Sequence, residues 1–206
     1  MQDPRLPPEL ERKIFLIALE IHGSKDVRNL LLIAKRVNDW LFPRVFEVVI
    51  LDSERKFPIP FTFEKFERYG PHIRSLLLTS VGIGIQAQTD LATEYISCCP
   101  NVTNLSIRAR FFDDDHLRDA ISSLPLTRLS IHISSILQGT SPQLFQLFAN
   151  LTHLHLFSSF LTPDDQPQSL RLFFPSLTHI ALTPAEPGQG LRAALTGWNK
   201  LRVVVI

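Results

Sequence analysis

Residues 151–156 read Leu-Thr-His-Leu-His-Leu, and their spacing decides the fold: an apolar residue, a second three positions later and a third two positions after that. Seven such triplets occur along the chain, and they begin 24 to 29 residues apart. They are Phe46/Val49/Leu51, Ile73/Leu76/Leu78, Val102/Leu105/Ile107, Leu126/Leu129/Ile131, Leu151/Leu154/Leu156, Leu177/Ile180/Leu182 and Leu201/Val204/Ile206. A fixed period of this size indicates a supersecondary unit that buries its apolar face only by stacking on copies of itself. The sequence therefore predicts a solenoid.

The last part of each triplet alternates apolar with polar residues, which is the period of a β-strand. Between the triplets lie segments with helical spacing, and Ser, Thr, Asp or Pro precede them at residues 113–115, 141–142 and 162–165. These residue types favour the first turn of a helix. Strands joined by crossover helices must lie parallel. We therefore expect an α/β fold with a curved parallel sheet inside and helices outside.

The triplets resemble the leucine-rich repeat, whose pattern is L-x-x-L-x-L-x-x-N/C-x-L. The first half of the pattern matches in all seven copies. The position of the usual Asn or Cys ladder holds other residues: Glu54, Val81, Arg110, Ser134, Ser159 and Ala185. The resemblance therefore implies a short, irregular leucine-rich-repeat-like solenoid over residues 46–206.

Composition excludes several classes of protein. The 206 residues carry a formal net charge of +1, so nothing in the total favours binding to nucleic acid or to a membrane surface. No apolar run approaches the roughly 20 residues needed to cross a bilayer, and the first residues do not read as a secretory signal. Cys98 and Cys99 are adjacent, so a disulfide between them is disfavoured; either they pack as small apolar residues or they form a redox pair. We expect a cytoplasmic or nuclear protein.

Residues 1–45 break the repeat and read as a helical module. A first helix follows Pro7 and Pro8, a turn lies at residues 22–25, and a second helix opens at Asp26 and carries apolar residues as far as Leu41. About 40 residues in short helices are too few to cover this much apolar surface. One face is expected to seek a second protein.

The head resembles the F-box in three stretches: residues 6–10 (Leu-Pro-Pro-Glu-Leu), Ile14-Phe15, and residues 33–36 (Ile-Ala-Lys-Arg). Val37 stands where that family usually has Trp, and Trp40 follows three residues later. Together with the repeats, the whole chain is similar to fungal F-box proteins.

This resemblance implies a substrate-recognition adaptor of an SCF-type (cullin-RING) ubiquitin ligase, in which the repeats hold a target protein. The residues that the resemblance places against the Skp adaptor are Leu6, Pro7, Ile14, Phe15, Ile33 and Val37. The alternative is that the helices only cap the open end of the solenoid. The protein would then be a stand-alone protein-binding scaffold.

The residues between the triplet positions point to the opposite face of the predicted sheet. That face is polar and basic in its middle, and it supplies the predicted target-binding residues: Arg108, Arg128, His132, His153, His155, Phe157 and His179. Three interpretations stay open. The face is a solvated surface that meets a protein, a pocket for an acidic or phosphorylated segment, or a zinc site made by His153, His155 and His179.

Motifs of catalysis are missing from the sequence. Gly82-Ile83-Gly84 lacks the third glycine of a dinucleotide loop, and Asp113-Asp114-Asp115 does not have the spacing of an EF-hand. Scattered Ser, His and Asp residues do not establish a triad. We expect a non-enzymatic binding protein without a cofactor or a structural metal.

Overall fold

The protein is described by a computed structural model, which covers residues 6–22, 27–52, 63–80, 85–108, 115–132, 148–157, 174–183 and 198–205. The chain divides into two compact units, Met1–Val48 and Val49–Ile206. The sequence places the boundary between residues 45 and 46.

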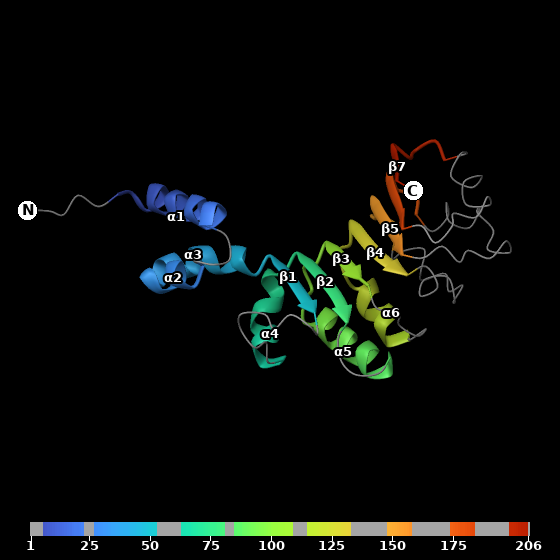
Figure 1. Cartoon of the computed structure of the whole chain (residues 1–206), viewed down its shortest axis with the longest axis horizontal. Coiled ribbons are helices and arrows are strands. Elements are labelled where there is room, and N and C mark those ends of the chain that lie inside the picture. The colour runs from blue at the N-terminus through green and yellow to red at the C-terminus, as the bar shows by residue number, and fades with distance from the viewer. Residues whose placement is uncertain are drawn as a thin grey trace, which may run out of the picture. The chain divides into compact units, whose positions relative to one another are not determined.

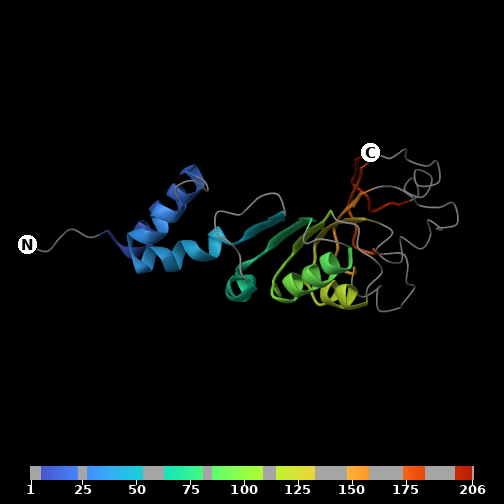
Figure 2. The same cartoon turned by 60° about the horizontal axis from the view of Figure 1, so that its bottom comes forward.

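The N-terminal unit contains three helices: α1 (Pro8–His22), α2 (Val27–Ile33) and α3 (Lys35–Val45) (Figures 1 and 2). Pro8 is the first residue of α1, where its missing N–H group costs nothing. The carbonyl oxygen of Pro7 accepts the N–H groups of Leu10 and Glu11 at 3.0 Å, which closes the first turn. Glu9 and Glu11 lie in that turn, where the helix dipole favours negative charge.

The second helix predicted for the head is divided into two at Ala34. Ala34 has an extended backbone (φ −159°, ψ 151°), although alanine has the highest helix propensity. The side-chain amide of Asn38 donates to the Leu31 carbonyl at 3.2 Å and so satisfies a carbonyl at the end of α2. Val37 and Leu41 on α3 are completely buried. The sequence predicted one continuous helix, and this prediction was wrong. Local helix propensity carries no information on the packing that buries Val37 and Leu41.

The second unit is built on a seven-stranded sheet in which the strands follow one another in chain order. The strands are β1 (Val48–Asp52), β2 (Ser75–Ser80), β3 (Asn104–Ile107), β4 (Arg128–His132), β5 (His153–Phe157), β6 (His179–Thr183) and β7 (Val203–Val205). Each pair from β2 to β7 is parallel. The predicted α/β class with a parallel sheet is therefore confirmed.

Helices run along one side of this sheet (Figure 1). They are α4 (Phe63–Tyr69), followed by a 3-10 turn at Gly70–His72, then α5 (Ile85–Ser97) and α6 (Asp115–Ser122). The helix predicted after residues 113–115 is α6, which begins at Asp115. The helical segments predicted to follow residues 141–142 and 162–165 lie outside the described residues, apart from Phe148 and Phe174, which are buried at their ends.

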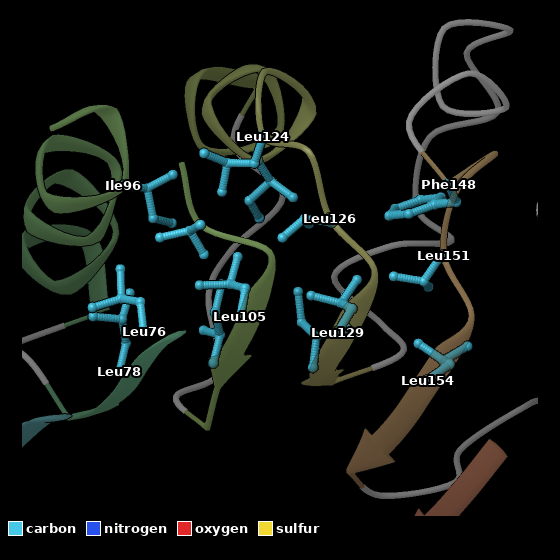
Figure 3. Packing of buried hydrophobic residues seen from close by; sticks show 14 of the residues in the cluster. Leu76, Leu78, Ile96, Leu105, Leu124, Leu126, Leu129, Phe148, Leu151 and Leu154 are labelled. Carbon is cyan, nitrogen blue, oxygen red and sulfur yellow. The ribbon is translucent and has the colours of Figure 1, made fainter. Parts of the chain in front are cut away.

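The triplet residues form the core of the second unit. From Ile73 to Leu182, every triplet side chain is at most 5% exposed. Leu76, Leu105, Leu129 and Leu154 project from four neighbouring strands to the same side, the side on which Ile96 of α5 lies (Figure 3). The alternation read from the sequence thus identifies the buried face correctly. In the described part of the chain, no helix is both long and apolar enough to cross a membrane.

Candidate functional site

The polar face of the sheet is the surface that carries the residues between the triplet positions. Strand pairing aligns Arg128, His153 and His179 in one row, and His132, Phe157 and Thr183 in another. His155 lies in the row between them. The residues predicted to lie opposite the core do so in β2 to β6, where their side chains are half-buried or exposed.

The first row forms what we call the strand-start cluster: Arg128, His153 and His179, which are the first residues of β4, β5 and β6. The rings of His153 and His179 are stacked, with centroids 4.1 Å apart and planes 4° from parallel. Parallel strands begin at the same edge of a sheet, so three successive repeats bring one arginine and two imidazoles together.

A ladder of threonine hydroxyls underlies this cluster. Thr103, Thr127, Thr152 and Thr178 each precede the first residue of a strand, and each hydroxyl donates to a backbone carbonyl of the preceding repeat at 3.1–3.3 Å. The acceptor for Thr103 is the Arg74 carbonyl, and each later threonine bonds to the carbonyl of the threonine before it. Threonine at this position in four repeats is the sequence signal for the ladder, which was not among the predicted features.

The ladder determines which nitrogen of each stacked histidine carries hydrogen. Nδ1 of His153 lies 2.8 Å from the Thr152 hydroxyl, and Nδ1 of His179 lies 2.8 Å from the Thr178 hydroxyl. Each hydroxyl has already given its hydrogen to a carbonyl, so its oxygen accepts from the imidazole. Both Nδ1 atoms are therefore protonated, and in the neutral rings each Nε2 keeps a lone pair that can take up a proton.

Replacing Thr152 by valine is expected to lower the free energy of unfolding by about 1 kcal/mol, because a hydrogen bond to the Thr127 carbonyl is lost. The substitution also removes the acceptor for His153 Nδ1, so nitrogen NMR shifts are expected to report a mixture of tautomers. Thr103→Val is the matched control, since Thr103 belongs to the same ladder but precedes Asn104. An unchanged His153 tautomer in Thr152→Val would contradict this account.

A second group of side chains, the aromatic cluster, lies towards the other ends of the strands: Arg108, His132, His155 and Phe157. The Phe157 ring centroid is 4.4 Å from that of His155 and 5.6 Å from that of His132, and the Arg108 guanidinium carbon lies 5.9 Å from it. His132 Nε2 is 3.0 Å from the Arg108 carbonyl, which can only accept, so this nitrogen carries hydrogen. Phe157 therefore packs against three cationic or titratable neighbours.

The environment keeps two histidines neutral near pH 7. Burial lowers the pKa of His153, and the neighbouring His179 and Arg128 lower it further. Burial also lowers the pKa of His155, with a smaller contribution from Arg108. Histidine normally titrates near pH 6.5, so both rings gain a positive charge only in more acidic solution or when an anion binds.

The zinc interpretation finds no support in this geometry. The lone pairs of the parallel His153 and His179 rings point side by side rather than towards a common point. Nε2 of His155 is 2.7 Å from the Thr183 hydroxyl. Among the residues with described side chains, no three His, Cys, Asp or Glu groups are arranged to hold a metal ion.

A second candidate surface lies on the helical unit. Leu10, Ile14, Ile17 and Ile21 have a spacing that places them along one face of α1, and they are 45% to 73% exposed. We call these four residues the α1 stripe. On α2, Leu32 and Ile33 are 74% and 57% exposed. Apolar side chains this accessible on one small unit are typical of an interaction surface.

Most, but not all, of the residues predicted to bind the Skp adaptor are accessible. Leu6, Pro7, Ile14 and Ile33 are exposed, and Phe15 is half-buried. Val37 has no exposed surface, so its side chain packs inside the protein and we withdraw it from the proposed contact surface. Sequence reasoning missed Leu10, Ile17 and Ile21, although their spacing from Ile14 follows the period of a helix.

The adjacent cysteines are both free thiols. Cys99 belongs to the apolar core, and burial raises its pKa to about 12. Burial also raises the pKa of the half-buried Cys98. Reactive thiols need a lowered pKa, so the packing interpretation fits better than the redox pair.

A scan of the sequence against models of known protein families finds no match. Comparison with curated proteins also finds none.

Proposed function

We propose that the protein is a non-catalytic substrate-recognition adaptor of an SCF-type ubiquitin ligase. In this proposal the helical unit binds the Skp adaptor and the repeat unit, a short leucine-rich-repeat-like solenoid, holds a target protein. The adaptor would act by bringing the target's lysines close to the chemistry of another enzyme.

The observation that carries the proposal is the α1 stripe, which follows directly on the Leu6-Pro7-Pro8-Glu9 start of the head. The stripe lies apart from the α1 side chains that are half-buried, which include Phe15, Ala18 and Leu19. Within the unit, the Arg36 guanidinium pairs with both carboxylate oxygens of Glu11 and so ties α3 to α1. A helix with an inner and an outer apolar face favours a second protein on the outer one.

The solenoid part of the proposal is supported by three features of the second unit. The strands follow chain order and are parallel from β2 to β7, and the triplets from Ile73 to Leu182 are buried at equivalent positions. Four successive repeats each bond to the one before through the threonine ladder. The ladder supplies side-chain hydrogen bonds between repeats at the starts of the strands. That role resembles the one expected of the Asn or Cys ladder that the sequence lacks.

Replacing Ile14 by aspartate is expected to weaken binding to the Skp adaptor at least about thirtyfold, because a buried anchor typically contributes 2 kcal/mol or more to an interface. Leu10→Asp is expected to act in the same direction. Titration calorimetry with the full chain and purified adaptor measures both effects. The matched control is Arg12→Asp, which puts the same charge on an exposed position of α1 outside the stripe.

All variants should retain the thermal unfolding curve of the parent protein, since the substituted side chains are exposed. A stable parent chain with no affinity for the adaptor would contradict the ligase function. That result would favour the stand-alone scaffold, in which the helices serve only as a cap.

A further inference from the structure

Within strands β2 to β6, the positive charge of the polar face is not balanced by acidic residues. Strands β2 to β6 contain no Asp and no Glu. In the described part of the chain, neither Arg108 nor Arg128 has a carboxylate partner, and both are exposed. An arginine head group presents five donors in a planar fork that matches a carboxylate. The face is therefore complementary to an anionic partner.

The spread of these groups indicates the size of that partner. Arg128 and His179 are two strand spacings apart, about 10 Å, and Arg128 and His132 are separated by about 13 Å along β4. One small anion cannot reach both the strand-start cluster and the aromatic cluster. An extended segment with several carboxylates can, because its side chains alternate at about 7 Å on each side. Strands β2 to β6 contain no lysine, and the two arginines of this face, Arg108 and Arg128, are too few for the phosphate contacts that a polynucleotide needs.

The stacked histidines give such a contact a dependence on pH. Among the described residues, the charged or titratable groups nearest the pair on the sheet are Arg128 on β4 and, one row along, His155, whose pKa Arg108 helps to lower. Burial lowers the pKa of His153, and His179 and Arg128 lower it further, so in the free protein they disfavour a proton on the His153 ring. A carboxylate bound beside the pair instead favours the protonated form of the imidazole. Two charged rings at a centroid distance of 4.1 Å would repel, so the pair takes up one proton rather than two.

We propose that the polar face binds an extended, carboxylate-rich segment of another protein, and that the His153–His179 pair takes up a proton as the segment binds. This inference rests on the proposed role of the repeats as the target-binding unit. The bound state holds one proton more than the free protein, so affinity rises as the pH falls. The rise ends where the free protein takes up the same proton.

The test uses the full chain and a fluorescent peptide of about ten residues in which Asp or Glu alternates with Ser. Fluorescence anisotropy is expected to show roughly fivefold to tenfold tighter binding at about pH 6 than at about pH 8, since one unit of pKa shift is a factor of ten. Arg128→Gln should weaken binding at both pH values. The double variant His153→Gln/His179→Gln should still bind at the higher pH but lose the pH dependence. His116→Gln on α6 controls for loss of an exposed histidine elsewhere and should keep it.

Two results would overturn the inference. One is equal binding of a peptide with Asn and Gln in place of the acids, which would remove any role for charge. The other is binding of a phosphoserine peptide with no affinity for the carboxylate peptide, which would assign the face to phosphate. Ile14→Asp separates this inference from the ligase function, because it changes only the head. If Ile14→Asp loses adaptor binding but still binds the peptide, the peptide site is supported. If the parent chain binds the adaptor but not the peptide, the peptide site is contradicted and the ligase function is not.

Discussion

Replacing Leu76 or Leu78 by alanine is expected to lower the free energy of unfolding by about 2–5 kcal/mol, whereas the same change at Leu77 is expected to cost less than about 1 kcal/mol. These are three consecutive leucines on β2, so residue type and local sequence are the same. Leu76 and Leu78 are 1% and 0% exposed and lie in the core, while Leu77 is half-buried on the polar face. Only the alternation of the strand distinguishes them.

The cost at Leu76 and Leu78 has two sources: lost transfer free energy and the cavity that the neighbouring strands cannot close. Leu105 and Ile107 face them on β3 in the parallel register and are themselves buried. Urea unfolding followed by circular dichroism measures all three variants under one condition. Similar losses for all three would mean that β2 does not have one buried and one open face, and the assignment of the polar face would fail with it.

Gly70→Ala is expected to destabilise the protein by about 3 kcal/mol, near the upper end for an overpacked site. Gly70 is buried, and a Cβ atom there would lie 1.9 Å from the carbonyl oxygen of Cys98 and 2.7 Å from its carbonyl carbon. These are backbone atoms, so no change of rotamer relieves the clash. The 3-10 turn that contains Gly70 would have to move away from the segment after α5, which also carries the buried Cys99.

Two further variants test the cause of this loss by thermal or urea unfolding. Glu67→Ala, on the exposed side of α4, should change the free energy of unfolding by no more than about 0.5 kcal/mol. The double variant Gly70→Ala/Cys98→Ala should remain destabilised, because the clash is with the backbone and not with the thiol. Recovery of stability in the double variant would place the contact on the side chain and contradict the close approach.

The sequence predicted the repeat unit better than the head. Along the repeats, a fixed apolar spacing determines both the strand and its buried face, so Leu129 and Leu154 could be placed in the core and Arg128 and His153 in one row. In the head, the resemblance to the F-box implied that Val37 is part of a binding surface, yet the side chain is buried. A helix with two apolar faces does not reveal in its sequence which of them the chain itself covers.

The candidate site was likewise predicted from the sequence only in part. Register brought Arg128, His153 and His179 together as expected, since equivalent residues of stacked repeats meet. The stacking of the imidazoles and their hydrogen bonds to Thr152 and Thr178 could not be predicted, because they depend on ring orientation as well as on register.

By itself the sequence determined the α/β class, the order and direction of the strands and which side chains face the core. These properties come from periodicity, which residues close together in the chain express without help from distant ones. The tertiary structure alone decided the break at Ala34, the burial of Val37, the approach of Gly70 to the Cys98 carbonyl and the protonated nitrogen of each stacked histidine. Each of these depends on atoms far apart in the chain, or on the exact orientation of a side chain, and the hydrophobic pattern carries no information on either.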